Sequence, residues 1–174
     1  LDSGALYRAF AYFYNQNFAN TEIVNSINKL VFIPEKDDMK ILFQDNEITS
    51  ALRNEEIAKA ASKLSALAET RELLINIQRN YMAGINIIAD GRDMGSVVFP
   101  EAELKIFLDA SAKVRAERRY LELQKRGQEV NMRDLIADIE QRDLKDRTRS
   151  LSPLVPADDS IIIDSSDMSL EEVL

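Results

Sequence analysis

The sequence predicts an α/β fold in which parallel strands alternate with helices, and three observations indicate it. Three short apolar runs, Ile85–Ala89, Leu104–Leu108 and Ser160–Ile163, are each followed by an aspartate. Runs that are apolar on both faces are typical of parallel strands buried between helices. Helical patterns over 112–126 and 132–148 lie between the second run and the third, which is the order that a parallel sheet requires.

The first half of the chain favours helices. A helix over 4–19 would place Leu6, Phe10 and Phe13 on one face, and a shorter helix is expected over 20–28. Residues 54–81 contain strong helix formers, and we expect two helices there with a break near 66–69.

A small antiparallel sheet is expected between these helices. Leu30–Ile33, Lys40–Phe43 and Glu47–Ile48 have the composition of short strands. Pro34–Asp38 and Gln44–Asn46 separate them with turn-forming residues. We therefore expect an inserted sheet within the α/β fold.

The composition excludes several classes of chemistry. The 174 residues, 45% hydrophobic and 30% charged, predict one soluble domain. Because the sequence has no cysteine and no histidine, disulfides, thiolate nucleophiles, Ser-His-Asp triads and metal sites built on these residues are excluded. There is no apolar run long enough to cross a membrane and no signal peptide, so we expect a cytoplasmic protein.

The ends of the sequence indicate a piece of a longer protein. The chain begins at Leu1 without a methionine. Ser169–Glu172 has the pattern of a capping box that opens a helix, yet the sequence stops at Leu174. We expect further residues at both ends.

The charge distribution indicates a small anionic ligand. The formal net charge of −8 argues against a general nucleic-acid binder. Residues 113–149 nevertheless hold 11 of the 22 lysines and arginines, and residues 150–174 hold none. A local arginine cluster on an acidic protein suits a compact anion better than a long polyanion.

The segment Asp90–Gly95 is the first candidate site. Asp90 follows a predicted strand, and Gly91, Arg92 and Asp93 come directly after it. Ligands bind at the carboxyl ends of parallel strands, and an aspartate there can hold Mg²⁺ or its water in phosphoryl transfer. The alternative is a tight turn in which Arg92 pairs with a neighbouring aspartate.

The second candidate is the end of the helix predicted over 132–148. Leu135, Ile139, Arg142, Asp146 and Arg149 form one stripe, apolar in its first half and charged in its second. This pattern would arise if the helix leaves the core and ends in a polar pocket. The alternative is a solvated helix end with ion pairs between successive turns.

Two further groups lie on predicted helices. Ser3 is placed to cap the first helix, so that Tyr7 and Arg8 would lie near a helix N-terminus that favours phosphate. Arg115 lies three and four residues before Arg118 and Arg119. These like charges repel unless an anion or a nearby glutamate compensates them, and a solvated face is the alternative.

Four stretches together resemble bacterial cytidylate kinase, a nucleoside monophosphate kinase. They are LDSGALYR, IADGRDMGSVVFP, KIFLDAS and QRDLKDRTRSLSPLVPA, in order over essentially the whole chain. The resemblance implies a P-loop NTPase-like parallel sheet flanked by helices and a small nucleotide-binding insert over about 29–60. It also implies a lid with adjoining helices over about 112–149, all within one incomplete domain over 1–174.

The resemblance implies transfer of the γ-phosphoryl group of ATP to CMP or dCMP, with Mg²⁺, by a monomer of pyrimidine metabolism. It implies that Arg92, Asp90 and Arg142 are catalytic. Ser3, Tyr7, Arg8 and Arg92 would lie near the acceptor phosphate, and Arg142 and Asp146 would hold the pentose. The residues implied for cytosine are Ser62, Arg71, Asp93 and Arg149, and those implied for the lid over ATP are Arg115 and Arg119. No residue is implied as a metal ligand.

One departure from the family is large. The family begins with a strand and a phosphate loop of the pattern G-x-x-x-x-G-K-S/T, and neither occurs in these 174 residues. We therefore expect this piece alone to be inactive. The alternatives are another nucleoside monophosphate kinase and a non-catalytic nucleotide- or anion-binding module.

Overall fold

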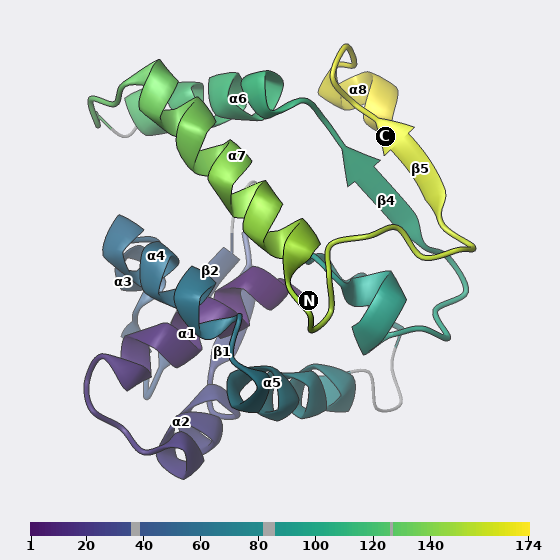
Figure 1. Ribbon diagram of the computed structural model, residues 1–174. Coiled ribbons are helices and arrows are strands. Elements are labelled where there is room, and N and C mark those ends of the chain that lie inside the picture. The colour runs from purple at the N-terminus through teal and green to yellow at the C-terminus, as the bar shows by residue number, and fades with distance from the viewer. Residues whose placement is uncertain (36–38, 82–85, 126) are drawn as a thin grey trace. The chain divides into compact units, whose positions relative to one another are not determined.

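The computed structural model describes residues 1–35, 39–81, 86–125 and 127–174. The chain forms two compact units, Leu1–Gly91 and Arg92–Leu174, and each is described by itself (Figure 1). Within the described residues, the helices are all too short or too polar to cross a bilayer.

The first unit is built around helix α1 (Ser3–Tyr14). Leu6, Phe10 and Phe13 are almost completely buried, which confirms the apolar face predicted from their spacing. The predicted helix was too long, since α1 ends at Tyr14 and Asn17 adopts a left-handed φ of 62°. That backbone conformation breaks a helix and is tolerated best by asparagine and glycine.

Four more helices belong to this unit. They are α2 (Asn20–Ile27), α3 (Thr49–Leu52), α4 (Glu55–Leu64) and α5 (Ala68–Tyr81). The break between α4 and α5 falls at residues 65–67, close to its predicted place. The short helix α3 was not predicted. The side chain of Asn54 caps α4 by accepting a hydrogen bond of 2.7 Å from the backbone N–H of Glu56.

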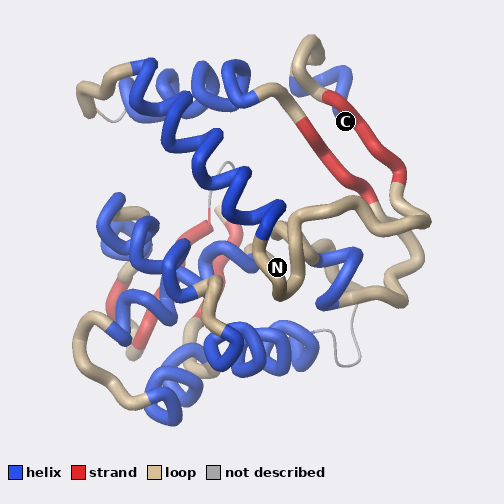
Figure 2. Tube along the Cα trace, in the orientation of Figure 1, coloured by secondary structure: helices blue, strands red, loops and turns tan. Residues whose placement is uncertain are grey.

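The predicted antiparallel insert is confirmed. Strands β1 (Val31–Pro34), β2 (Met39–Phe43) and β3 (Asn46–Glu47) pair in that order, as Figure 2 shows. Gln44 and Asp45, with φ of 49° and 65°, form the two-residue turn between β2 and β3. Ile41 is buried in the core of the unit and Phe43 packs edge-on against Phe13 of α1, so the insert is anchored to the helices.

The prediction of a strand over Ile85–Ala89 is wrong for the residues of this segment that the structure describes. Ile85 lies outside the described residues, and residues 86–89 are not a strand. Only Asp90 forms a parallel bridge, to Asp2, with hydrogen bonds from Asp90 N to Leu1 O (3.0 Å) and from Ser3 N to Asp90 O (3.1 Å). The N-terminal ammonium of Leu1 donates to the carbonyl of Ile88, so the contact between the two segments extends from Asp90 back to Ile88 without forming a strand.

The second unit contains one parallel strand pair. Strands β4 (Ile106–Asp109) and β5 (Ile161–Asp164) align in parallel, with Asp109 opposite Asp164. This confirms the predicted parallel pairing, shifted by one or two residues. The helices of the unit are η1 (Met94–Val98), a π-helix, together with α6 (Ala112–Lys125), α7 (Met132–Thr148) and α8 (Leu170–Val173).

The expectation that these strands are buried is wrong. Ile106 and Leu108 of β4 are each 56% exposed, and Ile161 and Ile162 of β5 are 55% and 63% exposed. An apolar strand is buried only where other elements cover it. In the described part of this unit, α6 packs mainly against α7 and neither helix covers the strand pair.

The ends of α6 and α7 follow their sequence signals. The backbone N–H of Gly127, at φ 71°, donates to Gln124 O (2.9 Å), and that of Gln128 donates to Leu123 O (3.0 Å). This is a Schellman ending, and it confirms the predicted stop at Gly127. Asn131 caps α7 by accepting from the N–H of Arg133 at 2.8 Å. Ser169 and Glu172 form the predicted capping box of α8.

Candidate active site

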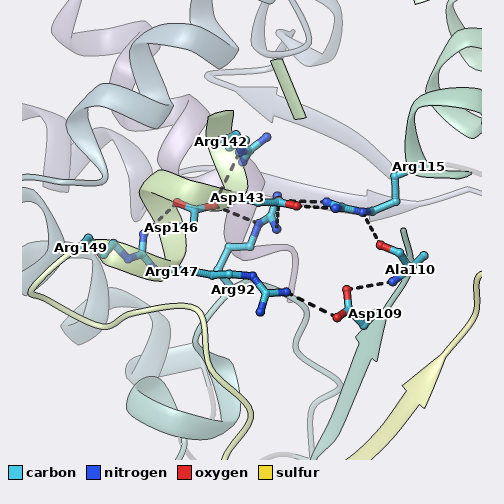
Figure 3. Close-up of polar contacts among 9 residues, drawn as sticks. All are labelled: Arg92, Asp109, Ala110, Arg115, Arg142, Asp143, Asp146, Arg147 and Arg149. Atoms are coloured by element: carbon cyan, nitrogen blue, oxygen red, sulfur yellow. Dashed lines mark hydrogen bonds and ion pairs between the residues drawn. The ribbon is translucent and has the colours of Figure 1, made fainter. Parts of the chain in front are cut away.

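The end of α7 carries a cluster of charged side chains in the second unit (Figure 3). Arg142 Nε lies 3.8 Å from Oδ2 of Asp146, and Arg149 Nη1 lies 3.4 Å from Oδ1 of the same carboxylate. Asp146 is buried, so two arginines from its own helix stripe compensate its charge. The apolar half of the stripe, Leu135 and Ile139, is only half-buried.

Arg92 reaches this cluster from the start of the second unit. Its Nε lies 3.6 Å from Oδ2 of Asp146, and its Nη1 lies 3.9 Å from Oδ1 of Asp143. Arg92 therefore bridges two aspartates of α7. Arg92 thus reaches aspartates beyond the tight turn of the alternative interpretation.

Arg115 of α6 is tied to Asp143 of α7. Nη1 and Nη2 of Arg115 donate in parallel to the two oxygens of the carboxylate, the first bond at 2.9 Å. Burial alone would raise the pKa of Asp143, but the hydrogen bonds from Arg115 and the charges of Arg115, Arg92 and Arg147 outweigh it and lower the pKa. The same hydrogen bonds raise the pKa of Arg115.

One more ion pair extends the cluster to the strands. Arg147 Nη2 of α7 lies 3.5 Å from Oδ2 of Asp109, at the carboxyl end of β4. The charge cluster thus contains more arginines than aspartates. Its members are Arg92, Arg115, Arg142, Arg147, Arg149, Asp109, Asp143 and Asp146. A partly buried excess of guanidinium groups is suited to binding a phosphate or another compact anion.

Two further predicted site residues of this unit are Asp93 and Arg119. Asp93 is 4% exposed, and its backbone carbonyl accepts hydrogen bonds from Val97 (3.0 Å) and Val98 (3.1 Å), which begin the π-helix. Arg119 pairs with Glu122 of its own helix at 2.8 Å. A glutamate therefore compensates Arg119, as the sequence allowed.

In the first unit, Ser3, Tyr7 and Arg8 lie in the first two turns of α1. The expectation that Ser3 caps this helix is wrong. Asp2 is the cap and accepts from the N–H of Ala5 at 2.9 Å, while Ser3 is the first helical residue and is buried. Aspartate caps a helix as well as serine does, and the bridge between Asp2 and Asp90 fixes Asp2 in the extended conformation that a cap requires.

The remaining predicted residues of the first unit are Ser62, Arg71 and Asp90. Arg71 of α5 is 3% exposed, and its Nη1 donates to the backbone carbonyl of Ser65 at 3.3 Å. Ser65 Oγ in turn donates to the carbonyl of Ser62, so Arg71 points to the end of α4 where Ser62 lies. Asp90 is exposed overall, but its carboxyl group is partly shielded from water. This desolvation, together with the negative charge of Asp2, raises the pKa of Asp90.

Sequence reasoning missed three members of the charge cluster: Asp109, Asp143 and Arg147. Asp143 follows Arg142 directly and so falls off the helical stripe that was considered. The sequence analysis names an anion or a nearby glutamate as the group that could compensate the repelling arginines of α6. In the structure an aspartate on the next helix, Asp143, compensates Arg115.

The parallel strand pair, the helices of the second unit and the arginine-rich cluster define an α/β protein whose charges suit a compact anion. Comparison with known proteins identifies the family: the family model for cytidylate kinase matches residues 1–174. The chain is 43% identical to a cytidylate kinase of Vibrio vulnificus (strain YJ016), covering 100% of this chain and 80% of that protein. It is 40% identical to cytidylate kinase 1 of Haemophilus influenzae, covering 100% of this chain and 78% of that protein. The chain belongs to the cytidylate kinase family, a family of phosphotransferases with a P-loop kinase-like α/β fold.

Proposed function

We propose that this protein transfers the γ-phosphoryl group of ATP to CMP or dCMP. An oxygen of the acceptor phosphate bonds to the γ-phosphorus, the bond from that phosphorus to ADP breaks, and CDP or dCDP leaves with ADP. Family membership supports the reaction, and the observation that carries the proposal is the charge cluster around Arg92, Asp143 and Asp146. Phosphoryl transfer depends mainly on positioning and on neutralising charge, which such a cluster supplies.

The arginines of the charge cluster would contact phosphoryl oxygens. We assign Arg92 and Arg142 to the transferred and acceptor phosphates, and Arg115 and Arg119 to the lid over ATP. Arg92 supports this assignment because its side chain is 36% exposed while two aspartates hold it at ion-pair distance. Asp146, within reach of Arg142, would accept a hydrogen bond from a pentose hydroxyl.

Ser3, Tyr7 and Arg8 are assigned to the acceptor phosphate. They lie in the first two turns of α1, where the helix dipole favours an anion. Asp90, at the bridge to Asp2, is assigned to the reaction centre, and its raised pKa is consistent with a carboxyl group that is partly withdrawn from water.

Cytosine would be recognised by Ser62, Arg71, Asp93 and Arg149. An ionised aspartate accepts a hydrogen bond from the exocyclic amine of cytosine, and serine or arginine donates to the ring acceptors. The burial of Arg71 and Asp93 supports this role, since hydrogen bonds read a base most strongly where water is excluded.

Mg²⁺ would enter with ATP rather than at a site built by the protein. Among the described residues there is no group of three or more carboxylates that could hold a metal ion. Mg²⁺ usually keeps several waters and binds through substrate phosphates and one or two carboxylates.

We further propose that residues 1–174 belong to one kinase domain that acts as a cytoplasmic monomer. The antiparallel sheet β1–β2–β3 would be the core of a nucleotide-binding insert over about 29–60. Helices α6 and α7 would form the lid and its support over about 112–149.

Turnover of the intact protein with ATP and a panel of acceptors tests the proposal. ADP formation with CMP, dCMP, UMP and AMP would be measured at equal concentrations. We expect kcat/KM for CMP and dCMP to exceed those for UMP and AMP by at least about tenfold, since a base-reading hydrogen bond discriminates strongly. A preference for AMP or UMP would indicate another monophosphate kinase, and nucleotide binding without turnover would indicate a non-catalytic module.

A further inference from the structure

We propose that Asp143 is a positioning residue that holds Arg115 and Arg92 side by side so that both guanidinium groups bind phosphoryl oxygens of the reacting nucleotides. This inference rests on the proposed function. It concerns a residue that has no assigned part in the reaction and that the sequence analysis did not select.

Arg115 is fixed at both ends of its guanidinium group. Nε donates to the carbonyl of Ala110 at 2.9 Å, and both terminal nitrogens donate to Asp143 (Figure 3). A guanidinium group has five N–H donors. In the part of the chain that the structure describes, these bonds use three of them and leave one N–H on each terminal nitrogen for a ligand. The direction of those two donors is set by Asp143 and Ala110.

Arg92 is held differently. Its distances of 3.9 Å to Asp143 and 3.6 Å to Asp146 are those of ion pairs and exceed the length of a hydrogen bond. The two aspartates therefore keep the charge of Arg92 in place without occupying its donors. Arg92 can turn its N–H groups to a phosphate and lose no hydrogen bond to either aspartate.

Asp143 makes the approach of these two cations possible. Arg115 and Arg92 come from distant parts of the second unit and repel each other, and the Asp143 carboxylate is the partner they share. Its side chain is 16% exposed, so solvent screens this interaction only in part. Without the carboxylate, the two guanidinium groups would separate and Arg115 would keep only its bond to Ala110.

A double-mutant cycle separates this role from a purely structural one. Asp143→Asn, Arg115→Ala and the double variant would be made in the intact protein, and kcat and KM measured for ATP and CMP. We expect Asp143→Asn to lower kcat by at least about tenfold. In the Arg115→Ala background, we expect the same change to alter kcat less than about threefold, because no Arg115 is left to position or to repel Arg92, and Asp146 still holds Arg92.

Two further variants serve as controls. Asp138→Asn removes an exposed carboxylate from the same helix and should leave kcat within about twofold of wild type. Asp143→Glu keeps the charge, so it should retain more of kcat than Asp143→Asn does. If circular dichroism shows that the asparagine variant is unfolded, Asp143→Ser, which also removes the carboxylate, replaces it in the cycle.

Two outcomes of these measurements would contradict the positioning role of Asp143. Additive losses in the cycle, or an Asp143→Asn protein with wild-type kcat and only a lower Tm, would overturn the positioning role while leaving the proposed function in place. A wild-type protein that phosphorylates neither CMP nor dCMP would overturn the proposed function and this inference together.

Discussion

Arg92 Nε lies 3.6 Å from Oδ2 of Asp146, and this ion pair ties the first residue of the second unit to the last turns of α7. Asp146 is also approached by Arg142 and Arg149. Three guanidinium groups thus share one buried carboxylate. This leaves a local excess of positive charge that a phosphate can neutralise, although the net charge of the protein is −8.

Arg92→Ala is expected to lower kcat/KM for CMP by at least about tenfold. A charge-assisted hydrogen bond to phosphate contributes about 1.5–3 kcal/mol, and about 1.36 kcal/mol corresponds to tenfold in rate. Steady-state kinetics of the intact protein would measure the loss. Arg133→Ala, which removes an exposed arginine at the start of α7, is the control and should stay within about twofold of wild type. Equal, small losses for both variants would remove Arg92 from the site.

Asp93→Asn is expected to reduce the preference for CMP over UMP. Cytosine carries an amine where uracil carries a carbonyl. An ionised Asp93 accepts from the amine but repels the carbonyl, whereas an asparagine of the same shape can donate to it. The ratio of kcat/KM for CMP to that for UMP should therefore fall by about tenfold or more, since an unpaired buried polar group costs about 1–3 kcal/mol.

The same measurement separates base reading from a role of Asp93 in the fold. Asp93 is buried, and its carbonyl begins the π-helix, so a structural role would reduce activity toward both nucleotides alike. An unchanged ratio with lower rates for CMP and UMP would mean that Asp93 supports the fold and does not read the base.

Acid is expected to weaken the link between α6 and α7. The lowered pKa of Asp143 in the folded protein means that its contribution to stability is full above its unfolded pKa of about 4 and is lost as the pH falls further. Urea unfolding at pH 7, 5, 4 and 3 would measure this. Asp143→Asn should be less stable than wild type at pH 7, and the gap should close at pH 3. A gap independent of pH would show that the Asp143 charge does not stabilise the fold.

Gly127→Ala is expected to destabilise the protein by about 1–2 kcal/mol. Gly127 ends α6 at φ 71°, a conformation that costs an L-residue about this much. A β-carbon there would meet no atom within 4 Å, so a clash cannot explain any loss. Gly127→Asn is the matched variant and should cost less, because asparagine tolerates this conformation better. Equal unfolding free energies for the alanine variant and wild type would contradict the prediction.

Local signals in the sequence predicted the elements that local forces determine. The spacing of Leu6, Phe10 and Phe13 predicts the buried face of α1, and Gly127 predicts the end of α6. The antiparallel insert follows from short strands and the turn at Gln44 and Asp45. In each case, residues near in sequence are sufficient to specify the structure.

Properties that depend on distant partners were predicted less well. The run before Asp90 is apolar, yet whether it forms a strand depends on the segment opposite, which it meets at Leu1 and Asp2. The burial of β4 and β5 depends on how helices pack around them, which apolar composition alone does not encode. Likewise, Asp143 joins the charge cluster because α6 packs against α7 and brings Arg115 to it, and because Arg92 approaches it from the start of the unit.

The open strand pair β4–β5 has a consequence for how the second unit responds to heat. The heat capacity of unfolding grows with the apolar surface newly exposed to water, and Ile106, Leu108, Ile161 and Ile162 already contact water in the folded state. The cluster of buried apolar side chains around α1 belongs to the first unit, whereas the second relies more on ion pairs. The free energy of unfolding of the second unit should therefore depend on temperature with less curvature than that of the first unit. Dissolved salt should also lower the stability of the second unit more than that of the first.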